Sequence, residues 1–111
     1  DLLLSGSTNG KPIAVVATAT LGTTIHTAVT GTSDFDYVEL SASNTHTAAV
    51  ELTLEWGAAG VGNEIKYTIA AKSTVALTGL HPLNNALVVT AYAGTASKIN
   101  VFGRVIRRTT V

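Results

Sequence analysis

The fold is decided by the stretch 50-VELTLEW-56, in which apolar side chains occupy the even positions and polar side chains the odd ones. Successive side chains of a β-strand point to opposite faces, so this pattern predicts a strand with one buried and one solvated face, and with Trp56 on the inner face. The stretch 64-EIKYTI-69 repeats the alternation, and the glycine-rich residues 57–63 between the two supply turn residues that tolerate positive φ. Together they predict a β-hairpin with a glycine-rich tip.

The rest of the chain follows the same period, and no segment sustains a helical period over three turns. Short segments of alternating or β-branched residues, separated by Gly, Asn and Ser, predict further strands at 13–20, 23–29, 37–43, 74–77, 86–93 and 99–107. Many short strands spaced roughly ten residues apart are typical of an antiparallel sandwich or barrel. We expect an all-β antiparallel β-sandwich of about eight strands, jelly-roll or Ig-like, over residues 13–111. Residues 1–12 are expected to form an extended N-terminal arm.

Composition narrows the class of protein further. A chain of 111 residues suits a single domain, and 46% hydrophobic against 13% charged residues is far from the composition of disordered chains. With no cysteine, neither disulfides nor thiolate metal sites are available. No apolar run approaches the roughly 20 residues of a membrane-spanning helix, so we expect no membrane partner.

The charges are balanced in sum but divided along the chain. The formal net charge is zero, which argues against nucleic acid as a partner. Every acidic residue except Asp1 lies between Asp34 and Glu64, and every basic residue except Lys11 lies from Lys66 onward. Two interpretations stay open: acidic and basic strands pair within one sheet, or the acidic face of one molecule meets the basic face of a neighbour.

Candidate catalytic and metal-ligating residues do not form a recognisable pattern. His26, His46 and His81 are the only histidines, none is two or four positions from another, and no Gly-x-Ser-x-Gly nucleophile motif occurs. The acids Asp34, Asp36 and Glu39 resemble part of a calcium loop, but an Asp-rich turn that opens a strand is the simpler interpretation. We therefore expect no enzyme, no catalytic residue, no metal and no cofactor.

The glycines and arginines have simpler interpretations than ligand binding. The glycines of 57–62 lack the Gly-Lys-Ser/Thr ending of a phosphate-binding loop. On a strand, Arg104 and Arg108 would share one face and Arg107 the other, which gives no continuous basic stripe. They either contact carboxylates on a neighbouring chain or lie at a solvated strand end. Tyr92 is expected on the outer face of its strand, where an exposed apolar spot more often marks a protein contact than a sugar site.

Several of these strand patterns together resemble a known group of proteins. The runs are 2-LLLSGSTNGKPI-13, 38-VELSASNT-45, 49-AVELTLEWG-57, 85-NALVVTAYAG-94 and 99-INVFGRV-105. They are similar to small β-sandwich virion structural proteins of tailed bacteriophages. The resemblance implies a virion protein, assembled in the host cytoplasm, that decorates or cements the head, with capsid or other virion proteins and further copies of itself as partners. It carries no catalytic residues.

An apolar arm on a rigid body can add a strand to the open edge of a neighbour. The residues expected to make protein contacts are Leu2, Leu3, Leu4 and Ile13 for the arm, and Tyr92, Arg104 and Arg107 for the body. The alternative functions are a receptor- or glycan-binding module of a fibre or spike, and a head-tail connector or tail component. Clustering of the three histidines would favour a small enzyme.

Overall fold

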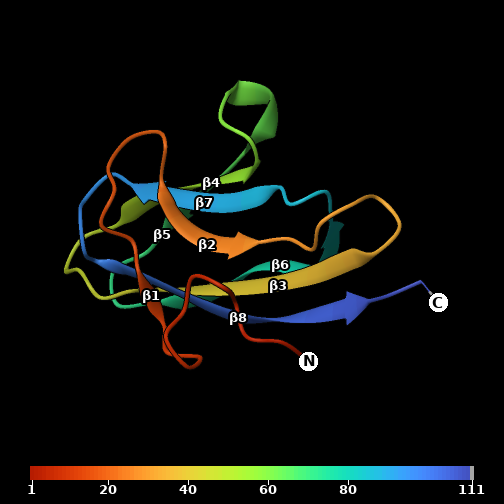
Figure 1. Ribbon diagram of the computed structural model, residues 1–111. Helices are drawn as coiled ribbons and strands as arrows, with labels where there is room; N and C mark the ends of the chain where they lie inside the picture. The colour runs from red at the N-terminus through yellow and green to blue at the C-terminus, as the bar shows by residue number, and fades with distance from the viewer. Residues whose placement is uncertain (111) are drawn as a thin grey trace.

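The computed structural model describes residues 1–110; Val111, the last residue of the expected domain, lies outside the described residues. Eight strands form two four-stranded antiparallel sheets packed face to face, as predicted (Figure 1). The strands are β1 (Ile13–Ala14), β2 (Thr23–Thr27), β3 (Phe35–Asn44), β4 (Val50–Gly57), β5 (Glu64–Ile69), β6 (Thr74–Leu83), β7 (Val88–Ala93) and β8 (Ile99–Arg108), with a 3-10 turn η1 (Val61–Asn63) at the β4–β5 tip. Within residues 1–110, no helix is long and apolar enough to cross a membrane.

The strand order identifies the type of sandwich. One sheet, which we call sheet A, has the order β1-β8-β3-β6, and the other, sheet B, has the order β2-β7-β4-β5. The antiparallel partners include β1 with β8, β2 with β7, β3 with β6 and β4 with β5, as if one long hairpin turning between β4 and β5 had been rolled up. This is the arrangement of an eight-stranded jelly roll, and it differs from the Ig-like strand order that the sequence left open.

The core lies between the sheets and follows the predicted alternation. In β3 every even position from Asp36 to Asn44 is buried, and in β4 the inward Leu52 and Leu54 are fully buried. Trp56 lies on the inner face of β4, as predicted, but at the end of the strand, where it is only partly buried and packs against the rim of the core.

Two predicted strand boundaries were wrong by six residues, and the other predicted strands differ from the structure by at most two residues at either end. The strand expected at 13–20 ends at Ala14, because the residues after Val15, whose N–H still donates to the Ile99 carbonyl of β8, cross to sheet B, where the Ala93 N–H donates to the Ala17 carbonyl. The strand expected to stop at residue 77 continues to Leu83. Gly79 did not break it, because the register between β3 and β6 shifts in this region and the extra residues are accommodated as bulges.

The N-terminal residues 1–12 lie along the sandwich. Leu2 forms an antiparallel bridge with Val105 at the edge of sheet A, with N···O distances of 2.6 and 2.9 Å. Leu4 is buried in the core, and the Gly6 N–H donates to the Ile25 carbonyl on the edge of sheet B. The segment therefore passes from the edge of one sheet to the edge of the other and covers one open side of the sandwich.

Candidate functional site

The most closely connected group of titratable side chains lies between the sheets, beside the N-terminal segment. Asp36 is fully buried and accepts hydrogen bonds from Arg107 Nε (2.7 Å) and Nη2 (3.0 Å), from the Val29 N–H (3.1 Å) and from His26 Nε2 (2.8 Å). The other ring nitrogen of His26, Nδ1, accepts the backbone N–H of Ser5 at 3.0 Å. Burial raises the pKa of Asp36, but the hydrogen bonds from Arg107 and His26 outweigh it and leave the pKa below its ordinary value.

This group contains a serine, a histidine and an aspartate, yet its geometry is not that of a nucleophile with its base. Because the Ser5 N–H is a donor, Nδ1 of His26 is unprotonated and Nε2 carries the proton that Asp36 accepts. The Ser5 hydroxyl accepts the Thr27 N–H at 2.7 Å and makes no bond to the imidazole. Both ring nitrogens are used within the chain, so the group joins β2, β3, β8 and the N-terminal segment to one another.

A second buried carboxylate lies on the outer face of sheet B. Sequence alternation predicted that Glu55 would face solvent, and this was wrong: Glu55 is fully buried. Its oxygens accept bonds from the Gly22 N–H (2.8 Å), the Thr90 hydroxyl (2.7 Å) and the Thr20 hydroxyl. Burial raises the pKa of Glu55, but these three bonds outweigh it and lower the pKa. The segment between β1 and β2 folds over this face and covers the carboxylate.

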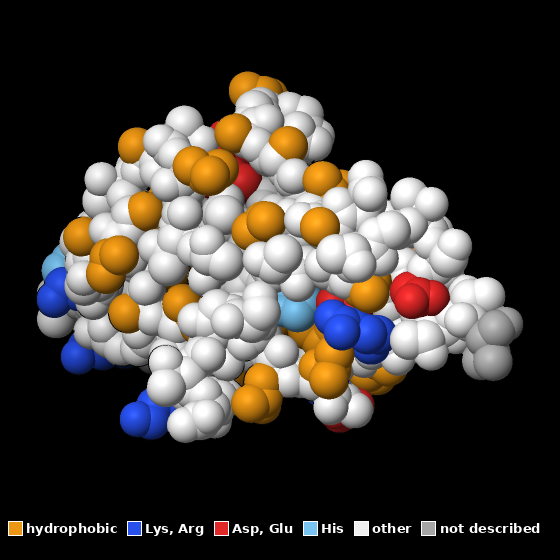
Figure 2. Space-filling model, viewed as in Figure 1, with side chains coloured by type: hydrophobic (Ala, Val, Ile, Leu, Met, Phe, Trp, Pro, Cys, Tyr) orange, Lys and Arg blue, Asp and Glu red, His pale blue; other side chains and the backbone are white. Residues whose placement is uncertain are grey.

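Pairing across strands accounts for much of the division of charge. Asp36 pairs with Arg107 and Glu39 with Arg104 between β3 and β8, and Lys66 lies 3.6 Å from Glu51 within sheet B. On the face seen in Figure 2, charged side chains form small separate groups and no continuous basic stripe. The first of the two interpretations, pairing within one molecule, therefore describes these residues.

The structure separates the residues considered for metal binding. His26 is in the buried group, His46 follows β3 in a loop, and His81 lies on β6. Asp34 accepts the Thr110 N–H, whereas Asp36 and Glu39 bond to different arginines. Among residues 1–110, no three His, Asp or Glu side chains come together as metal ligands would.

The residues predicted to contact a partner differ widely in accessibility. Leu2 and Leu3 are exposed, at 38% and 59%, but Leu4 and Ile13 are buried in the core. A contact of Leu4 with a neighbouring chain would require the N-terminal segment to leave its own sandwich. The protein-contact role of these residues stays a prediction.

The body residues expected at an interface already have partners within the chain. Tyr92 is on the outer face of β7, where its hydroxyl donates to Glu64 Oε2 at 3.0 Å and the Lys66 ammonium lies 5.5 Å from its ring centroid. Arg104 bonds to Glu39 and to Asp1. Their protein-contact role likewise stays a prediction.

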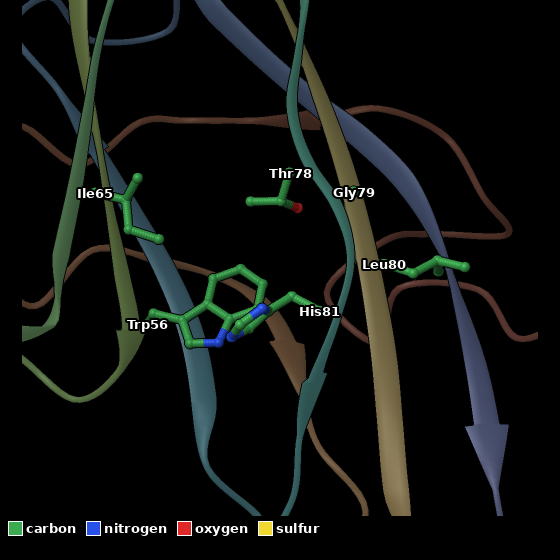
Figure 3. Close-up of a pocket in the computed structure, with 6 residues that line it drawn as sticks. All are labelled: Trp56, Ile65, Thr78, Gly79, Leu80 and His81. Atoms are coloured by element: carbon green, nitrogen blue, oxygen red, sulfur yellow. The ribbon is translucent and has the colours of Figure 1, made fainter.

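A pocket that sequence reasoning missed opens between the edge strands β5 and β6, and its volume is about 210 Å³. Trp56, Ile65, Thr78, Gly79, Leu80 and His81 line it. The Trp56 ring comes from β4 and the His81 ring from β6, and the two meet edge to face with their centroids 5.5 Å apart. Ile65 faces them from β5, and the Leu80 side chain points away (Figure 3). The signal in the sequence was the uncharged run from Ser73 to Ser97, which contains no Asp, Glu, Lys or Arg.

Comparisons with models of protein families, with curated proteins and with solved structures give no match to this chain.

Proposed function

We propose that this chain is a non-enzymatic structural protein of a bacteriophage virion, which decorates or cements the capsid through its strand edges and surface contacts. The observation that carries the proposal is that the buried titratable side chains are paired by hydrogen bonds within the chain. The side chains of the buried His26–Asp36–Arg107 group and of the buried Glu55 make their hydrogen bonds to other groups of the same chain. A body built this way offers a partner surface and edge rather than a reactive group.

The fold supports this proposal by analogy. The jelly roll recurs in viral capsid domains and also in lectins, so topology alone favours either a capsid component or a glycan-binding module. A glycan site would need Tyr92 and Trp56 to present free ring faces, and both rings are occupied by neighbouring side chains. Lys66 lies over the Tyr92 ring, and Trp56 is partly buried with its ring against His81. This arrangement favours the structural role.

Location in purified native particles tests the proposal. We expect mass spectrometry to detect the chain in particles, and single-particle electron microscopy to place this jelly roll in many copies over the shell. A ring of copies at a single vertex would instead identify a connector, and copies on a fibre or spike would identify a receptor-binding module. Absence of the chain from purified particles would refute a virion role.

A further inference from the structure

We propose that the pocket beside Trp56 is a docking site for an extended, uncharged polypeptide segment, which inserts one large apolar side chain between β5 and β6. The geometry of the pocket and of the adjoining strand edges supports the site. The expectation that the segment belongs to another virion subunit rests on the proposed function.

The indole of Trp56 needs an acceptor that the chain does not supply. Trp56 Nε1 is buried, and it is the one buried side-chain nitrogen or oxygen in the described residues without a hydrogen-bond partner. Buried polar groups in native proteins are almost always paired, and an unpaired group calls for a ligand or a water. A polypeptide carbonyl that enters the pocket would provide the missing acceptor once the His81 side chain, whose ring packs against the indole, turns aside and uncovers Nε1.

The size and lining of the pocket fit a side chain better than a cofactor. A volume of about 210 Å³ is below the roughly 300–1,000 Å³ of small-molecule sites. No carboxylate, amide or basic side chain other than His81 lines it. An added Cβ at Gly79 would meet no atom within 4 Å, so the wall formed by β6 is open there. One apolar side chain fits this description.

The adjoining strand edges favour an extended occupant. β5 pairs with β4 in unbroken register from Val50–Ile69 to Glu55–Glu64, and β5 is the last strand on its side of sheet B. The facing edge of sheet A is β6, whose register with β3 shifts twice. A regular edge is the better template for an added strand, and alternate side chains of that strand would point into the gap between the sheets.

Charge selects a neutral occupant. The pocket-lining residues of β6 belong to the uncharged run from Ser73 to Ser97, and Ile65 forms the opposite wall. The nearest cation on β5, Lys66, is already within 3.9 Å of Glu64 and 3.6 Å of Glu51. A charged side chain would therefore enter an apolar pocket without a counter-ion, which is unfavourable.

The single tryptophan makes the test direct, because the full chain has one indole N–H signal in a ¹H–¹⁵N spectrum. The probe is the capped pentapeptide acetyl-Ser-Thr-Leu-Thr-Ser-amide, compared with the same peptide carrying Glu in place of Leu. We expect the Leu peptide to shift the Trp56 indole signal downfield and saturably, with a Kd on the order of 1 mM. The Glu peptide is expected to bind at least roughly tenfold more weakly than the Leu peptide.

Two matched variants locate the binding. Ile65→Lys places a charge on the pocket wall and is expected to weaken binding of the Leu peptide about tenfold. Val61→Lys places the same charge on the exposed hairpin tip, where Val61 is 87% exposed, and is expected to leave binding unchanged. The proposal is overturned if the folded protein shows no saturable indole shift, if the Glu peptide binds equally, or if Ile65→Lys has no effect. It is also overturned if methyl glucoside gives the saturable shift instead of the peptide. None of these results bears on whether the chain is found in virions.

Discussion

Two acid–arginine pairs join β3 to β8, and the structure predicts that they contribute very differently to the free energy of unfolding. Asp36 faces Arg107 and Glu39 faces Arg104 in directly opposed register positions. Asp36 is fully buried, whereas the Glu39 and Arg104 side chains are 41% and 47% exposed. Substitution of each acid by alanine therefore compares the same kind of pair in two environments.

Asp36→Ala removes the acceptor of four hydrogen bonds. Arg107 is 38% exposed and can turn to water, but the His26 Nε2–H and the Val29 N–H remain without an acceptor. Each unsatisfied buried donor costs about 1–3 kcal/mol, and breaking a buried ion pair costs about 3–5 kcal/mol. We expect Asp36→Ala to lower the free energy of unfolding by about 3–4 kcal/mol. Glu39→Ala is expected to lower it by less than about 1 kcal/mol, because exposed pairs contribute little.

Urea unfolding followed by the fluorescence of the single tryptophan measures both values. With an m-value of about 1.5 kcal/mol/M, the midpoint for Asp36→Ala should fall by about 2 M, and that for Glu39→Ala by less than about 0.7 M. Equal midpoints for the two variants would refute the reasoning, since burial is the feature that separates the pairs. Unchanged m-values would confirm that the comparison is made within one unfolding transition.

Three further predictions concern single positions. Because the pKa of Glu55 is lowered in the folded chain, its carboxylate stabilises the protein above the unfolded value of about 4.3, and that contribution is lost as the pH falls toward the folded value. Urea midpoints between pH 3 and pH 6 should therefore depend less on pH in Glu55→Gln than in the unsubstituted chain, and an identical dependence would contradict this. Leu4→Ala should lower the free energy of unfolding by about 2–4 kcal/mol and the exposed Leu3→Ala by less than about 0.5 kcal/mol, as measured by chemical denaturation; similar losses would mean that the N-terminal segment does not pack as described. Gly103→Ala should lower the thermal midpoint measured by circular dichroism, at a cost of about 2 kcal/mol or more, because a Cβ there would overlap the Glu39 carbonyl oxygen; a neutral result would show that the two backbones can separate.

The strands were predictable from sequence where one face of a strand meets the core and the other meets solvent. In β4 the aliphatic even positions are buried, and in β8 the apolar inward positions such as Val101 and Val105 are buried, as the alternation of residue types requires. Glu55 defeated this reasoning, because the segment after β1 covers the outer face of sheet B and provides donors from Thr20 and Gly22. Alternation reports which face a side chain takes, but it carries no information on a loop that returns to cover that face.

The candidate sites depended on contacts between residues far apart in the chain. Asp36 and Arg107 are separated by 71 positions, and their opposition follows from the register of β3 with β8, which no local pattern specifies. The pocket at Trp56 likewise requires β5 and β6 to be the outer strands of opposite sheets. The charge or apolar character of each site residue could be read from the sequence, whereas the residues that surround it in space depend on the strand topology.

The polar residues at the two ends of β3 help to fix how the two sheets lie on one another around the apolar core. On the inner face of β3, Asp36 and Asn44 flank the buried Val38, Leu40 and Ala42. Asp36 bonds across to the histidine of β2, and at the other end the Asn44 amide donates to the carbonyls of Ala48 (3.0 Å) and of the last residue of β5 (2.9 Å). Because a buried polar group is stable only in the geometry that pairs it, these two residues fix how sheet A lies on sheet B at both ends of the strand. A body fixed in this way would lose little conformational entropy on binding, as the proposed docking of a segment at the edge between β5 and β6 requires.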